Sequence, residues 1–153
     1  MKRKMINLLP ILAAALGVAA GLCATSVAAF AQDDVCSVAT LYGPYGIQTT
    51  GSIVAFGPIG PVADTGIIKF DGAGGVSQTT TVSLNGLIIP NRSSLSGSYT
   101  VNPDCTGDWA LVLPVPGGTT TSTAHFVIVD HGKEIRLVVT GAGRVLAGNA
   151  RKQ

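Results

Sequence analysis

Turn-forming residues recur along this chain at short intervals, with runs rich in Val, Ile and Thr between them. Asp71-Gly72, Asn85-Gly86 and Asn102-Pro103-Asp104 are three of these turn signals. Gly and Asn adopt the positive φ angles of tight turns, whereas β-branched residues favour strands. No segment after residue 31 has a sustained 3.6-residue apolar period. The pattern predicts an all-β fold, built as a meander of antiparallel strands.

Eight strands are expected from the apolar alternation between these turns. The clearest case is the strand in which Leu95, Tyr99 and Val101 share one face and Ser and Thr occupy the other. After Asn85-Gly86, residues 87–89 extend either the loop or the strand. The predicted strands are residues 47–56, 63–70, 76–84, 95–101, 105–113, 121–129, 134–140 and 144–151.

A meander of eight antiparallel strands has two exposed edges unless the sheet closes on itself. Closure gives a small eight-stranded antiparallel barrel, whose interior is either filled by side chains or holds one small ligand. A two-sheet β-sandwich is the alternative. An outer-membrane barrel would need an apolar outer band with aromatic girdles. One face of residues 76–84 is Ser and Thr, and aromatics make up 5% of the chain, so we reject that class.

The first 31 residues have the order of a secretory signal peptide. Basic residues at positions 2–4 precede an uncharged run that ends at the small-x-small triplet Ala29-Phe30-Ala31. We expect cleavage after Ala31 and a secreted or periplasmic protein, preceded in the precursor by a helical leader. An uncleaved membrane anchor is the alternative, because the uncharged run exceeds the ~20 residues that span a bilayer.

Removal of the leader changes the charge balance. The chain has 10 Lys and Arg and 8 Asp and Glu, and 3 of the basic residues lie in the leader, which leaves 7 against 8. This balance gives no support to nucleic-acid binding or to membrane binding after cleavage, and we expect neither partner. Residues 32–153 have the size of one domain. We divide them into an N-terminal segment, 32–46, and a β-barrel domain, 47–153.

Two cysteines remain outside the leader, Cys36 and Cys105. An isolated pair in an oxidising compartment is expected to form a disulfide, which here would tether the N-terminal segment to the middle of the domain. Chain entropy gives about 4 kcal/mol of stability for a loop of this length. The rival interpretations are a metal site and a catalytic thiol. Neither cysteine has a His or a second Cys at ligand spacing, so we expect no metal and no cofactor.

Two stretches resemble a known group of proteins. They are residues 70–74, Phe-Asp-Gly-Ala-Gly, and residues 97–107, Gly-Ser-Tyr-Thr-Val-Asn-Pro-Asp-Cys-Thr-Gly. Together they resemble small secreted bacterial proteins assigned to an allene-oxide-cyclase-like or lipocalin-like (calycin) barrel, and the strand-and-turn pattern extends the resemblance over most of the chain after the leader. The resemblance implies a fold. It carries over no catalytic residue, since no position here matches the functional positions of the plant cyclase.

Four residues are candidates for contact with a ligand inside the barrel. Gln78 and Thr80 share a strand face with three apolar residues, and Tyr99 and Trp109 are expected to point inward. An apolar lumen with a few polar groups is typical of a small-ligand site. Alternatively, Gln78 and Thr80 lie near a barrel mouth and are hydrated.

His125 is a fifth candidate. Facing inward, it could act as a base or hydrogen-bond donor in the cavity. Because Phe126 and Ile128 occupy the other face of its strand, we favour a solvent-facing or structural histidine. No G-x-S-x-G, phosphate loop or Ser-His-Asp pattern is present, so the catalytic residues stay unknown. Asn91-Arg92-Ser93 matches a glycosylation sequon.

Three classes of function follow. The first is an exported barrel that binds a small apolar ligand without catalysis. The alternative is a structural or surface-interaction module with a filled core. The second alternative is a cyclase- or isomerase-type enzyme that uses the barrel cavity. We rank binding first and the enzyme last, because the sequence contains no catalytic constellation.

Overall fold

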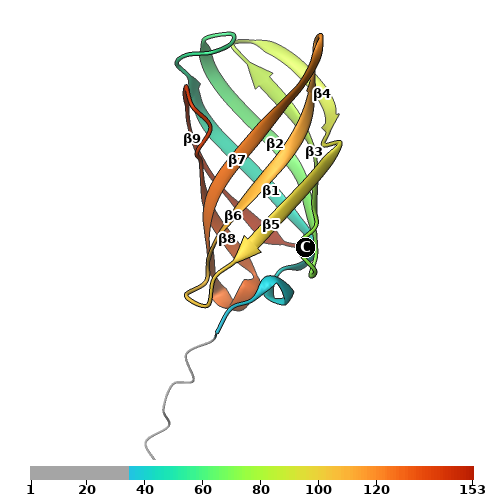
Figure 1. Cartoon of the computed structure of the whole chain (residues 1–153). Coiled ribbons are helices and arrows are strands. Elements are labelled where there is room, and N and C mark those ends of the chain that lie inside the picture. The colour runs from blue at the N-terminus through green and yellow to red at the C-terminus, as the bar shows by residue number, and fades with distance from the viewer. Residues whose placement is uncertain (1–34) are drawn as a thin grey trace, which may run out of the picture. The chain divides into compact units, whose positions relative to one another are not determined.

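The computed structural model of the chain describes residues 35–153 (Figure 1). The predicted leader and its cleavage site lie outside the described residues. Between residues 35 and 153, no helix is long and apolar enough to cross a membrane.

The described residues form strands joined by short turns, with a single turn of 3-10 helix at two places (Figure 1). In chain order the elements are η1 (Val38–Thr40), β1 (Tyr42–Ile53), β2 (Gly60–Asp71), β3 (Val76–Leu84), β4 (Leu87–Ser93), β5 (Ser96–Val101), β6 (Thr106–Val115), β7 (Gly118–Val129), η2 (Asp130–Gly132), β8 (Glu134–Val139) and β9 (Arg144–Lys152).

All the strands join in one antiparallel sheet with the order β4-β3-β2-β1-β9-β8-β7-β6-β5. The sheet curls through 235° into an open half-barrel. Its outermost strands, β4 and β5, are consecutive in the chain. The two sides of the sheet approach each other at the start of β3, where Gly75 and Ser98 form an isolated bridge and the Tyr99 N–H donates to Gly74 O at 2.8 Å.

The predicted all-β antiparallel meander is confirmed, but the closed eight-stranded barrel is wrong in strand number and in closure. The two-sheet alternative is also wrong, because every strand belongs to the same sheet. The additional strand is β4. Asn85 and Gly86 both have positive φ, 47° and 88°, which is the backbone of a two-residue hairpin turn, so β3 leads directly into β4.

The first strand starts at Tyr42 rather than at Ile47, so it crosses the predicted boundary at residues 46 and 47. Gly43, Pro44 and Gly46 have the composition of a strand breaker, yet they continue the ladder with β2. The same strand ends earlier than predicted. Phe56 lies in the β1–β2 loop with a φ of 59°, outside the extended region.

Aromatic side chains fill the interior at the end of the half-barrel that carries η1. The rings contact one another in a chain, with centroids between 5.0 and 6.2 Å apart; two of the four pairs are edge-to-face and two are tilted. Such pairs add to the hydrophobic stabilisation that burial of each ring supplies. The members of this aromatic core are Tyr45, Phe70, Tyr99, Trp109 and Phe126.

The residues around η1 cover this end of the interior. Leu41 is fully buried beneath η1. The Tyr99 hydroxyl donates to Val38 O at 2.7 Å and to Leu41 O at 3.1 Å, and the Tyr45 hydroxyl donates to Gly132 O at 2.6 Å. Each buried hydroxyl therefore donates to a backbone carbonyl of a segment that covers this end of the interior. These segments are the covering segment, residues 36–41, and η2.

The disulfide between Cys36 and Cys105 is confirmed. It joins the residues before η1 to the turn between β5 and β6, and the Cys36 N–H adds a hydrogen bond to Pro103 O at 3.2 Å. The covalent link holds the covering segment against the aromatic core, so this end of the half-barrel is both filled and closed.

Candidate functional site

Beyond the aromatic core, the interior contains a cavity of about 120 Å³. Engineered cavities of about 150 Å³ admit a benzene molecule, so the hollow has room for a ligand of about that size. It lies toward the end opposite η1, because its lining includes residues near the ends of β1, β3, β6 and β8 and near the starts of β2, β7 and β9. The apolar lining residues are Ile47, Ile53, Val62, Val82, Leu84, Ile89, Trp109, Leu113, Leu137, Val139 and Leu146.

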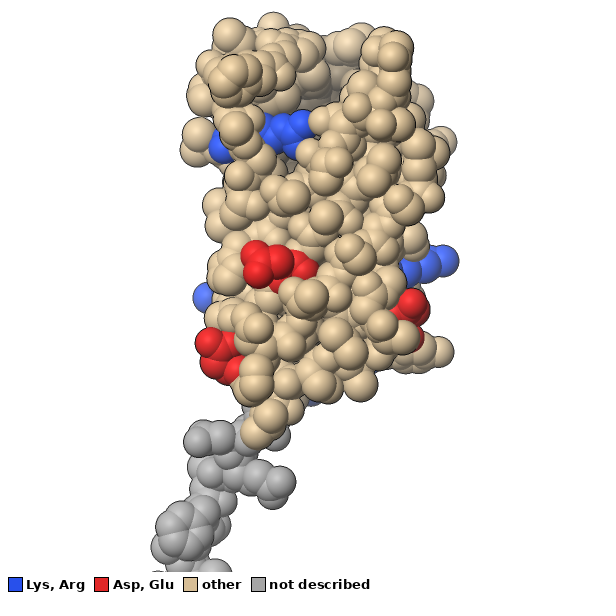
Figure 2. Space-filling view, viewed as in Figure 1, with Lys and Arg blue, Asp and Glu red and all other residues tan. Residues whose placement is uncertain are grey.

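Six polar side chains interrupt these apolar walls, and three of them are ionisable. The polar lining residues are Thr49, Asp64, Gln78, Arg92, Ser122 and Arg144. Figure 2 shows basic side chains set into a hollow of the surface in the upper part of the view, away from the end with η1. An apolar hollow with a small number of polar groups is the usual composition of a small-molecule site.

Asp64 lies on β2 directly opposite Thr49 on β1. The Thr49 hydroxyl donates to Asp64 Oδ1 at 3.0 Å. Burial raises the pKa of the Asp64 carboxyl, and the hydrogen bond from Thr49 and the charge of Arg92 partly oppose that rise. The carboxyl is therefore easier to protonate than an exposed aspartate.

Arg92 reaches the cavity because β4 contains a β-bulge. The register between β3 and β4 shifts so that Pro90 and Asn91 together lie between the pairs Val82–Ile89 and Thr80–Arg92. Asn91 has a φ of 50°, a left-handed conformation that Asn tolerates better than most residues. In regular alternation Ile89 and Arg92 would point to opposite faces; the bulge turns both toward the interior.

Two positive charges face the same hollow. Burial lowers the pKa of the Arg92 guanidinium, the nearby Arg144 lowers it further, and Asp64 raises it. Arg92 Nε is buried and has no hydrogen-bond partner. Arg144, at the start of β9, makes a long contact of 3.5 Å from Nη2 to the Thr120 hydroxyl.

The structure brings Gln78 and Trp109 together in the cavity lining. Thr80 is buried beside them, and its hydroxyl accepts a hydrogen bond from Gln78 Nε2 at 3.2 Å. Trp109 also contacts Phe70 and Phe126, so its ring separates the filled part of the interior from the hollow part. Ligand binding by these residues stays a prediction.

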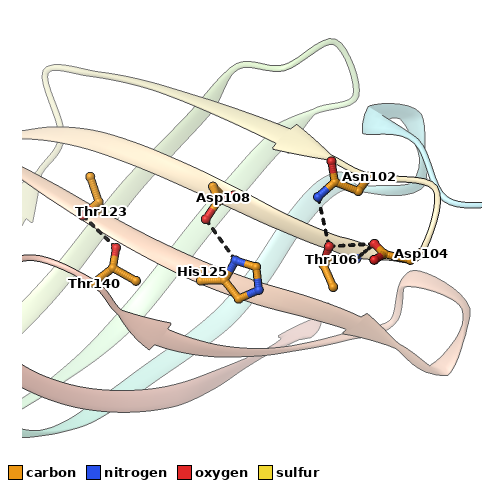
Figure 3. Close-up of polar contacts among 7 residues, drawn as sticks. All are labelled: Asn102, Asp104, Thr106, Asp108, Thr123, His125 and Thr140. Atoms are coloured by element: carbon orange, nitrogen blue, oxygen red, sulfur yellow. Dashed lines mark hydrogen bonds and ion pairs between the residues drawn. The ribbon is translucent and has the colours of Figure 1, made fainter.

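The other two predicted site residues lie elsewhere. Tyr99 belongs to the aromatic core, where its hydroxyl is bonded to the covering segment. His125 lies on the outer face of β7, where its Nδ1 lies 3.0 Å from Asp108 Oδ1 of β6 (Figure 3). Both side chains of that pair are about half exposed, 48% and 62%. The geometry is that of a surface cross-strand pair, as the sequence favoured.

Metal-ligating side chains do not gather in the part of the chain that the structure describes: no group of three or more His, Cys, Asp or Glu is placed to hold an ion. The outer face of β6 to β8 instead carries small polar ladders (Figure 3). The Thr140 hydroxyl donates to the Thr123 hydroxyl at 2.9 Å, which links the strand end of β8 to β7.

The sequence did not single out Asp64, Arg92 or Arg144 as site residues. Two of them carried a usable signal. Asp64 has the same parity along its strand as Val62 and Ile68, and Arg144 has the same parity as Leu146, so alternation alone places these charges on apolar faces. Arg92 gave no such signal, because the bulge changes the parity of β4.

Comparison of the chain with protein-family models, with curated proteins and with solved structures found no significant match.

Proposed function

We propose that this chain is an exported, non-catalytic binding protein that holds a small, largely apolar molecule in the cavity of its half-barrel. The main observation in support of this proposal is that the interior is packed at one end and hollow at the other. Protein interiors are normally packed as densely as organic crystals, and unfilled apolar volume lowers stability. A hollow with apolar walls beside a well-packed core is best explained by an occupant.

Export is part of the proposal. The predicted leader supports it, and so does the Cys36–Cys105 disulfide, since such bonds persist in oxidising compartments. The resemblance to secreted barrels of the allene-oxide-cyclase-like or calycin group points in the same direction.

The alternatives fit the interior less well. A surface-interaction module does not require an internal cavity. A cyclase or isomerase would need an acid and a base at the reacting atoms. The ionisable groups of the cavity lining are Asp64, Arg92 and Arg144. Because arginine stays protonated in proteins, Asp64 is the one group of these three that can exchange a proton there.

The test compares two neighbouring residues on opposite faces of β8. Val139 lines the cavity, whereas Val138 is 47% exposed on the outside. Val139→Phe fills the hollow, and Val138→Phe adds the same atoms outside it. Each variant and the wild type are purified from the protein's own host and measured by native mass spectrometry.

We expect the wild type and Val138→Phe to carry the same small molecule, and Val139→Phe to be empty. Trp109, the one tryptophan of the chain, lines the cavity and supplies a second readout by its fluorescence during re-addition of the molecule. Repeatedly empty wild type, or equal occupancy in both variants, would contradict the proposal.

A further inference from the structure

We propose that the ligand carries a single negative charge, of the carboxylate class, and that Arg92 and Arg144 bind this group inside the cavity. This inference rests on the proposed function and adds the chemical class of the ligand to it. A small aromatic or short aliphatic acid has both required parts, an apolar body and an anionic group.

The charges of the lining are unbalanced. Two guanidinium groups and one carboxyl group face the hollow. Among the ion pairs of residues 35–153, none within 4.0 Å joins Arg92 or Arg144 to a carboxylate. The charge of Asp64 raises the pKa of Arg92, and the Asp64 Oδ1 accepts a hydrogen bond from the Thr49 hydroxyl rather than from an arginine. One net positive charge therefore faces the cavity without a bonded counter-ion.

The two arginines also have hydrogen-bonding capacity to spare. Arg92 Nε is buried with no partner, although buried polar groups in proteins nearly always have one. The 3.5 Å contact of Arg144 with Thr120 is at the limit of a hydrogen bond. A carboxylate presents two oxygens in a plane, which matches the fork of N–H donors on a guanidinium.

The bulge in β4 shows that Arg92 is built into this position. Without the bulge, regular alternation from Ile89 would place Asn91 inward and Arg92 in solvent. The chain instead adopts a left-handed φ at Asn91 and turns a cation toward apolar walls. A charge in that environment is unfavourable unless it is paired, and β-bulges frequently direct side chains at functional sites.

Size and charge distinguish a carboxylate from a phosphate. With Asp64 ionised, a monoanion would neutralise the net charge of the lining, whereas a dianionic phosphate would exceed it. A hollow of about 120 Å³, mostly lined by aliphatic side chains, leaves space for an apolar body of about the size of one aromatic ring.

The experiment uses ligand pairs that differ only in the anionic group. Benzoate is compared with benzyl alcohol and hexanoate with 1-hexanol, and phenyl phosphate is added as a dianion. Binding to the disulfide-bonded protein without its leader is followed by Trp109 fluorescence and by calorimetry. The variants are Arg92→Met, Arg144→Met and Arg92→Lys. Arg136→Met is the matched control, because Arg136 is 70% exposed and pairs with Glu134 on the outer face of β8.

We expect the wild type to bind each acid about 10- to 100-fold more tightly than its alcohol, the range that a charge-assisted hydrogen bond supplies. Arg92→Met and Arg144→Met should each lose most of this preference. Arg92→Lys should keep part of it, since it keeps the charge but not the fork. Arg136→Met should behave as the wild type. Arg92→Lys and Arg144→Met keep the test valid if Arg92→Met fails to fold.

The contrary outcomes separate the two proposals. Equal binding of acid and alcohol by the wild type overturns this inference and leaves the proposed function standing. An acid preference that survives both Met variants also overturns it, as does tighter binding of phenyl phosphate than of benzoate. If no member of either pair binds to the wild type, the inference and the proposed function both fail.

Discussion

Asp64 and Asp71 lie on the same strand, β2, and their pKa values shift in opposite directions. Burial raises the pKa of Asp64 inside the half-barrel. Asp71 is exposed at the end of the strand, where its Oδ1 accepts hydrogen bonds from the backbone N–H groups of Ala73 at 2.7 Å and Gly75 at 2.8 Å, which lower its pKa. An aspartate side chain thus lines the cavity at position 64 and stabilises a turn at position 71.

Asp64→Asn should flatten the dependence of stability on pH. A carboxyl whose folded pKa lies above its unfolded pKa costs stability as the pH rises from the unfolded value through the folded value. The variant removes that cost, so relative to the wild type it should gain stability as the pH rises above about 4. The midpoint of urea unfolding, measured from about pH 3 to pH 8, reports the difference.

Asp71→Asn is the control with the opposite sign. Its folded pKa is lowered, so its contribution is present above the unfolded pKa and is lost as the pH falls through the folded pKa. The variant should therefore lose stability relative to the wild type at neutral pH and approach it in acid. If Asp64→Asn were instead less stable than the wild type at neutral pH, the interactions with Thr49 and Arg92 would outweigh burial.

At the scale of elements, β4 combines two roles. As an outermost strand it presents unpaired backbone groups, and proline and β-bulges are common ways to protect such edges from pairing with other chains. Pro90 and Asn91 form the bulge, which also turns Arg92 inward. One local irregularity therefore protects an edge and shapes the cavity.

Asn91→Val should lose about 1–2 kcal/mol of stability, because a β-branched residue is strained at a positive φ. Asn91→Gly has no such strain and should stay within about 0.5 kcal/mol of the wild type. Urea unfolding of both variants measures the difference. Equal stabilities for Val and Gly would mean that residue 91 does not need the left-handed conformation.

The disulfide and η1 act together at the other end. Replacing Cys36 and Cys105 with serine should lower the free energy of unfolding by up to about 4 kcal/mol, the chain-entropy value for a closed loop with a sequence separation of 69. In this variant the amide hydrogens of the covering segment, residues 36–41, should exchange faster than they do in the wild type, and faster than those of the central strands β1 and β9. Unchanged exchange in residues 36–41 would show that Leu41 and the Tyr99 hydroxyl suffice to hold the segment.

At the scale of the whole molecule, local alternation predicted the strand faces and non-local pairing decided the rest. The inward face of β3, with Val76, Thr80 and Val82 buried, follows directly from its period-2 pattern. Sheet closure does not, because the approach of Gly75 to Ser98 joins segments that no local pattern relates. The predicted first strand also began too late, at Ile47, because the pairing of Gly43 and Pro44 with β2 depends on a partner distant in the sequence.

The site was predictable to a similar degree. The inward placement of Gln78 and Trp109 was predictable because they alternate regularly with apolar neighbours, and both line the cavity. Arg92 could not be found in that way, because a bulge depends on the register against the partner strand and has no fixed sequence signature. Asp64 was overlooked although its parity was informative.

The proposed function requires a half-barrel that is packed at the η1 end and able to admit a ligand at the other. Two-dimensional NMR of the labelled protein, titrated with benzoate, distinguishes the two ends. Signals of Val82, Val139 and Leu146 should shift during the titration, whereas those of Tyr45 and Leu41 should not. Shifts confined to the outer face around Asp108 and His125, or no shifts at all, would contradict this arrangement.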